Sequence, residues 1–86
     1  MPYIDINGRN TLHHMTIELG KLISTEGELN YVVTRLLLAY VYKFGKSYKV
    51  INTVGGVLWC AGQEFYRRLA APYEDTKINE NGDVYL

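Results

Sequence analysis

Apolar residues in the first third of the chain fall on one side of a helix. Their positions follow i, i+3, i+7, i+10, a spacing that predicts an amphipathic helix over about residues 8–24. Asp5 or Asn7 is expected to cap its first turn, because short polar side chains accept the free N–H groups there. The apolar side consists of Leu12, Met15, Leu19 and Leu22.

A second helix is predicted over about residues 28–44. Thr25 and Glu28 have the spacing of a capping box, and Gly45 is a suitable residue to end the helix. Between Tyr31 and Tyr42 the only polar residues other than tyrosine are Thr34 and Arg35. A helix that is apolar on nearly every side is typical of a central helix or of one in a subunit interface.

A third helix is predicted over about residues 48–71, with Ser47 as its N-cap. Three glycines inside it each cost about 1 kcal/mol relative to Ala, and a backbone or a ligand that approaches closely there would explain them. Pro72 either ends this helix or opens a last turn. The predicted core side consists of Ile51, Val54, Leu58, Ala61, Phe65 and Leu69, and the glycines are Gly55, Gly56 and Gly62.

The tail, residues 77–86, contains Asn81-Gly82 between short segments that suit strands. This pair favours a two-residue hairpin turn. The prediction is a mainly α single domain over residues 1–86: a three-helix bundle with a short C-terminal β-hairpin. A chain this short has a small core. Where a helix is apolar on two sides, a second subunit is the natural way to cover the second side, so we expect a homo-oligomer.

Composition narrows the class of protein. The chain has 86 residues, 48% of them apolar, and nine Lys+Arg against nine Asp+Glu. Charge is nevertheless segregated: residues 1–30 carry −2, residues 31–70 carry +5 and residues 71–86 carry −3. The basic middle suits a small anion, whereas the acidic flanks disfavour a long nucleic acid. The apolar runs are too short for a membrane span and the N-terminus lacks signal-peptide features, so we expect a cytoplasmic protein and no membrane partner.

Residues able to support catalysis or metal binding are sparse. Cys60 is the only cysteine, and His13 and His14 are adjacent, so they point about 100° apart on a helix. No nucleophile, base and orienting group can be placed together. We therefore expect no enzyme activity, no catalytic residue, no metal and no cofactor.

Seven aromatic or cationic residues are the candidate ligand-binding set. Tyrosine and tryptophan rings can stack on a nucleobase, and guanidinium groups can hold phosphate. The alternative for Arg35 is a subunit interface, in which it pairs with a carboxylate of another chain. The alternative for Arg67 and Arg68 is that they stabilise the C-terminus of the third helix and pair with Glu74 or Asp75. Glycine spaced with aromatics along the third helix could accept a flat ligand or a neighbouring helix. The set consists of Tyr31, Arg35, Trp59, Tyr66, Arg67, Arg68 and Tyr73.

Three stretches of the chain resemble a family of small phage, prophage and bacterial proteins of unknown function. They are GELNYVVTR (residues 27–35), EFYRRLAAPYED (residues 64–75) and ENGDVY (residues 80–85). By its traits, although not by a motif, the chain is also similar to phage proteins that sequester a nucleotide immune signal in an oligomer. Those proteins bind the nucleotide in pockets between subunits, and aromatic and cationic residues line these pockets.

This likeness implies a non-enzymatic homo-oligomer that binds a small anionic nucleotide, a cyclic nucleotide or an ADP-ribose derivative, and so counters host defence. A protein inhibitor or accessory factor that docks on a host protein through aromatic helix faces is the alternative, because binding hot spots are rich in the same residues. A hydrolase of the same signal would need an acid/base pair that the sequence does not supply.

Overall fold

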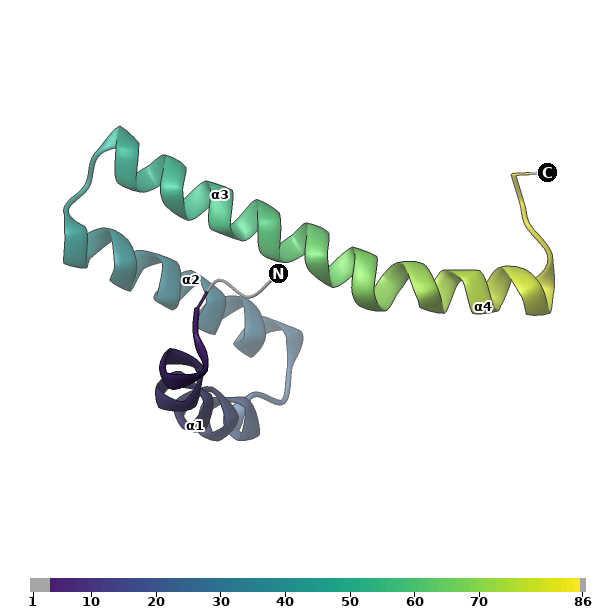
Figure 1. The fold of residues 1–86 in the computed structure, drawn as a ribbon, viewed down its shortest axis with the longest axis horizontal. Coiled ribbons are helices and arrows are strands. Elements are labelled where there is room, and N and C mark those ends of the chain that lie inside the picture. The colour runs from purple at the N-terminus through teal and green to yellow at the C-terminus, as the bar shows by residue number, and fades with distance from the viewer. Residues whose placement is uncertain (1–3, 86) are drawn as a thin grey trace. The chain divides into compact units, whose positions relative to one another are not determined.

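A computed structural model describes residues 4–85. The chain divides into two compact units, Met1–Leu38 and Ala39–Leu86, which are described separately. The elements in chain order, coloured from purple to yellow in Figure 1, are α1 (Ile6–Leu22), α2 (Glu26–Phe44), α3 (Tyr48–Phe65), a π-helical turn η1 (Tyr66–Ala70) and α4 (Ala71–Asn81). The prediction of a mainly helical protein is confirmed. The bundle packing and the oligomer stay predictions.

In the first unit, side-chain caps fix where the helices begin. Asp5 Oδ1 accepts the N–H of Gly8 at 2.9 Å and caps α1. Thr25 Oγ1 accepts the N–H of Glu28 at 3.1 Å, while Glu28 Oε1 accepts the N–H of Thr25 at 2.9 Å. This reciprocal pair is the predicted capping box, and it sets the first turn of α2.

In the second unit, the junction between α2 and α3 also follows local chemistry. Gly45 has a φ of +90°, and its N–H donates to the carbonyl of Val41 at 2.8 Å, which closes the end of α2. Ser47 Oγ accepts the N–H of Val50 at 3.2 Å and caps α3. Both residues have the roles that the sequence predicts.

Pro72 does not end the third helix. In η1 the N–H of Ala71 donates to the carbonyl of Tyr66, five residues earlier. A proline inside a regular α-helix has no N–H to donate, and its ring collides with the carbonyl four residues before it. The wider turn gives room for Pro72 in the first turn of α4. As a result α3, η1 and α4 form one continuous helical run, Tyr48–Asn81, visible in Figure 1.

The predicted C-terminal β-hairpin is wrong. Residues 77–81 belong to α4, and no strand occurs in the described part of the chain, which excludes Leu86 at the end of that prediction. Gly82 has a φ of +89° and its N–H donates to the carbonyl of Ile78 at 2.8 Å, so it ends a helix. A type I′ hairpin turn needs positive φ at Asn81 as well, and over residues 4–85 only glycines have positive φ.

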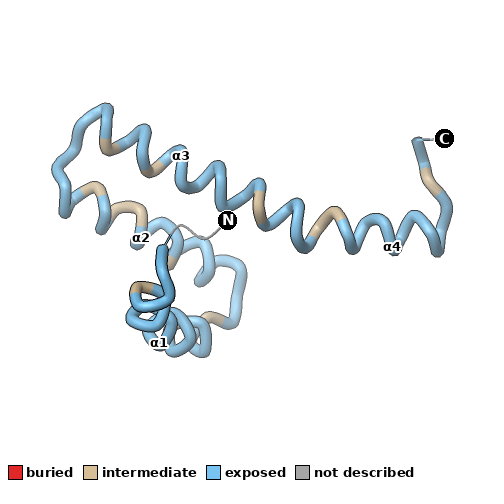
Figure 2. The backbone as a smooth tube through the Cα atoms, viewed as in Figure 1, coloured by how far each residue is buried: buried red, intermediate tan, exposed pale blue. Residues whose placement is uncertain are grey.

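From Ile4 to Tyr85, no residue is buried, and Figure 2 colours every described residue as intermediate or exposed. Inside each unit, the backbones of the described helical elements approach one another closely only where α3, η1 and α4 adjoin. The predicted core side of the third helix is open: Leu58 is 49%, Phe65 64% and Leu69 60% exposed. Apolar side chains in this number need cover from outside their own unit.

None of the helices described here is both long enough and apolar enough to cross a membrane.

Candidate functional site

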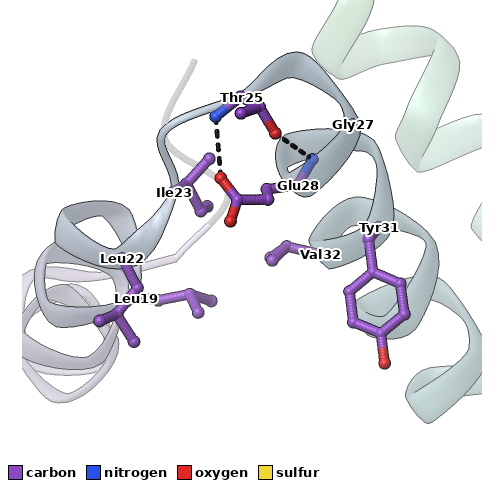
Figure 3. A pocket seen from close by; sticks show the side chains of 8 residues that line it. All are labelled: Leu19, Leu22, Ile23, Thr25, Gly27, Glu28, Tyr31 and Val32. Atoms are coloured by element: carbon purple, nitrogen blue, oxygen red, sulfur yellow. Dashed lines mark hydrogen bonds between the residues drawn. The ribbon is translucent and has the colours of Figure 1, made fainter.

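Tyr31 lines a hollow in the first unit, between the end of α1 and the first turns of α2 (Figure 3). Its volume is about 500 Å³. Apolar side chains come from both helices, and the capping box forms one side. The lining residues are Leu19, Leu22, Ile23, Thr25, Gly27, Glu28, Tyr31 and Val32.

Among the described residues that line this hollow, the one charged group is the carboxylate of Glu28. Glu28 accepts hydrogen bonds from the backbone N–H of Ser24, at 2.9 Å, and from Thr25. These bonds, the one from Ser24 first, lower the pKa of Glu28 and keep its carboxylate charged. Arg35 lies one turn beyond Tyr31 on α2, exposed and outside the lining. The hollow itself therefore suits an apolar or neutral group, and a phosphate would have to bind at Arg35.

Within residues 4–85, Arg35 forms no salt bridge. Its side chain is exposed on α2.

Arg67 and Arg68 share one carboxylate. Arg67 Nη2 lies 3.0 and 3.1 Å from the two oxygens of Glu64, and Arg68 Nε lies 3.4 Å from Oε2. The hydrogen bond from Arg67 is the main reason why the pKa of Glu64 is lowered. The acidic partner is thus Glu64, whereas the sequence suggested Glu74 or Asp75. Because the helix continues to Asn81, the two arginines are not at a helix C-terminus.

Tyr66 and Tyr73 each contact a charged side chain. The hydroxyl of Tyr66 donates to Glu74 Oε2 at 3.2 Å, and this bond is the main reason why the pKa of Tyr66 is raised. Residues eight apart are about 80° apart on a regular α-helix, and the extra residue in η1 brings them to one face. Lys77 Nζ lies 5.5 Å from the ring centre of Tyr73, a cation–π distance.

Trp59 is 68% exposed on α3. A Cβ added at Gly55 or Gly62 would meet nothing within 4 Å. The glycine face formed by Gly55, Trp59 and Gly62 of α3 and Tyr66 of η1 is therefore open in a single chain. Either a flat ligand or another helix could approach its backbone closely.

The predicted ligand set is divided between the two units. Tyr31 and Arg35 lie close together on α2 in the first unit, and the other five residues lie on the helical run of the second unit. Sequence reasoning did not include Glu64 and Lys77 in the site. The acid-to-base spacings i+3 and i+4 from Glu64 to the arginines were the available signal.

A second hollow of about 360 Å³ lies at the end of α4, in the segment for which the sequence predicted a hairpin. It is bounded by the aromatic rings of Tyr73 and Tyr85, by the aliphatic side chain of Ile78 and by the charged side chain of Lys77. Acidic Glu74 and Asp83 also line it, so its charge is mixed.

Metal-binding groups are not clustered in the structure. Across residues 4–85, no three His, Cys, Asp or Glu side chains lie close enough to hold an ion. Cys60 is a free, exposed thiol. The residues available here are therefore suited to stacking, charge pairing and apolar contact.

No curated protein and no solved structure matches the chain. One family model does match, over residues 1–84, and it is described as a domain of unknown function, DUF6899. The match extends over both units and nearly the whole sequence. The chain belongs to the DUF6899 family.

Proposed function

We propose that the protein is a non-enzymatic homo-oligomer that binds a small anionic nucleotide and holds it unchanged. In a host cell such binding would remove a cyclic nucleotide or ADP-ribose immune signal and so counter antiviral defence, which is the setting that the resemblance to small phage proteins supplies. Sequestration requires affinity and abundance without turnover, in keeping with the residue types available.

The observation that carries this proposal is the pairing of a free cation with an exposed ring on α2. Arg35 forms no salt bridge within residues 4–85, and Tyr31 is 65% exposed one turn away. Guanidinium binds phosphate oxygens through two parallel hydrogen bonds, and a phenol ring stacks on a base. Trp59 offers a second exposed ring in the other unit.

The test incubates the purified protein with cyclic di-AMP, cyclic GMP–AMP and cyclic ADP-ribose, and then heats the complex to release what is bound. Depletion followed by recovery of the intact nucleotide supports sequestration. Recovery of an altered nucleotide means catalysis, and an undepleted panel contradicts the proposal. Arg35→Ala is expected to abolish depletion, whereas Arg9→Ala, which removes an exposed cation from α1, is the matched control and should deplete normally.

A protein-docking function is the second candidate, and one observation favours it. Glu64 neutralises part of the charge of Arg67 and Arg68, which reduces their attraction for phosphate. An inhibitor that docks on a host protein needs exposed aromatic residues more than free cations.

Glu64→Gln tests whether Arg67 and Arg68 also hold the phosphate. If the arginines hold phosphate, removal of the competing carboxylate should tighten nucleotide binding about three- to tenfold, as expected for one charge removed near an exposed site. If neither arginine holds phosphate, nucleotide binding is unchanged and both arginines remain available to dock on a protein. Isothermal titration with the nucleotide depleted in the first experiment measures the difference.

A further inference from the structure

The helical run Tyr48–Asn81 carries an apolar seam with a strict heptad spacing. Its members are separated alternately by three and four residues, the pattern by which two helices pack along a common seam. Its large members are all exposed. The heptad seam consists of Tyr48, Ile51, Gly55, Leu58, Gly62, Phe65 and Leu69.

Side-chain size alternates along the middle of the heptad seam. Gly55 and Gly62 occupy one set of positions, and Leu58 and Phe65 occupy the other. When a second helix runs in the opposite direction, the glycine positions of one helix face the large-residue positions of the other. Gly55 then faces Phe65 of the partner subunit, and in the same register Gly62 faces Leu58 of the partner subunit.

A parallel pair would instead place glycine opposite glycine and leave voids. Such voids are costly, because protein interfaces pack as densely as interiors. The Cβ positions of both seam glycines are open in the single chain, so a partner helix has room to approach.

Charge favours the same direction and the same register. Lys49 lies in the first turn of the run and Lys46 just before it, while Glu74 and Asp75 lie in the first half of α4. In the register set by the glycines, Lys49 lies within one helical turn of Glu74 of the partner subunit, and opposite charges meet at both ends. A parallel pair would place like charges together.

We propose that the helical run of the unit Ala39–Leu86 pairs with a second copy, antiparallel, about a twofold axis level with Cys60. The pairing deepens the homo-oligomer part of the proposed function and needs no nucleotide. It also brings the Trp59 rings of both copies to the same side of the seam next to the axis. There they could stack on one flat ligand from two sides.

Two leucine substitutions test the seam. Gly62→Leu should weaken self-association at least tenfold, because the new side chain collides with the partner, while helicity measured by circular dichroism is kept or raised. Gly56→Leu makes the same change one position outside the seam, also into open space, and should leave self-association unchanged. Equal affinity of wild type and Gly62→Leu would overturn the pairing, as would equal losses in the two variants.

Spin labels test the direction. In a Cys60→Ser background, Thr76→Cys places one label per chain in α4, sixteen residues from the proposed axis. With a rise of 1.5 Å per residue, two labels in an antiparallel pair lie about 48 Å apart along the seam. Electron–electron resonance should find that separation, whereas a distance below about 20 Å would mean a parallel pair, contrary to the proposal. Both experiments are carried out without nucleotide, so failure of ligand binding cannot be mistaken for failure of pairing.

Discussion

The same Gly→Ala change should have opposite effects at two positions of the second unit. At Gly45 the backbone φ of +90° is one that a side chain opposes, so alanine should lower the free energy of unfolding by about 1–2 kcal/mol. At Gly56, inside α3, the added Cβ meets nothing within 4 Å. Alanine there should raise the free energy of unfolding by about 1 kcal/mol, the difference in helix propensity.

For a chain of this length, 1 kcal/mol corresponds to a shift in Tm of about 4–8 °C. Thermal unfolding followed by circular dichroism at one fixed protein concentration measures both variants, since self-association makes Tm depend on concentration. Gly45→Ala should melt below wild type and Gly56→Ala above it. A lower Tm for Gly56→Ala would refute the reasoning, because it would mean that a neighbour packs on the side of α3 that we place outside the heptad seam.

Two further predictions concern titration. Because the pKa of Glu28 is lowered in the folded chain, the contribution of this carboxylate to stability is present above the ordinary carboxyl pKa and is lost as the pH falls through the folded value. In urea unfolding at a series of acidic pH values, Glu28→Gln should therefore lose less stability than wild type as the pH falls. Since Glu74 raises the pKa of Tyr66, one tyrosine should ionise late in an ultraviolet pH titration, and Glu74→Gln should abolish that late step; an unchanged curve would argue against the hydrogen bond.

Helix boundaries could be predicted wherever they depend on neighbouring residues. The cap of Ser47, the capping box of Thr25 with Glu28 and the role of Gly45 each involve residues only a few positions apart. Their geometry is local, so the sequence alone contains the information.

Asn81-Gly82 misled the prediction because the same dipeptide suits two structures. Glycine with positive φ serves a hairpin turn and also the end of a helix. Which of the two structures forms depends on whether Pro72 ends the preceding helix. The π-helical turn η1 allows the helix to continue past Pro72. A π-turn has no clear signal in the residue pattern.

The binding role of the candidate set stays a prediction, and the sequence indicated its residue types but not their charge partners. Tyr31 and Arg35 emerge as exposed neighbours, as their spacing predicts. The pairing of Arg67 and Arg68 with Glu64 depends on side-chain conformation, which periodicity does not fix. The predicted core side of the third helix is open in a single chain, because an apolar helix side looks alike whether its cover comes from its own chain or from a second copy.

Sedimentation equilibrium of the unmodified protein, without nucleotide and at micromolar concentration, tests the central claim most directly. One chain has a mass of 9.9 kDa. Antiparallel pairing predicts a particle that contains an even number of chains, and Gly62→Leu should lower that number. A wild-type particle of one chain at these concentrations would contradict the account, because the open apolar seam would then be covered without a second copy.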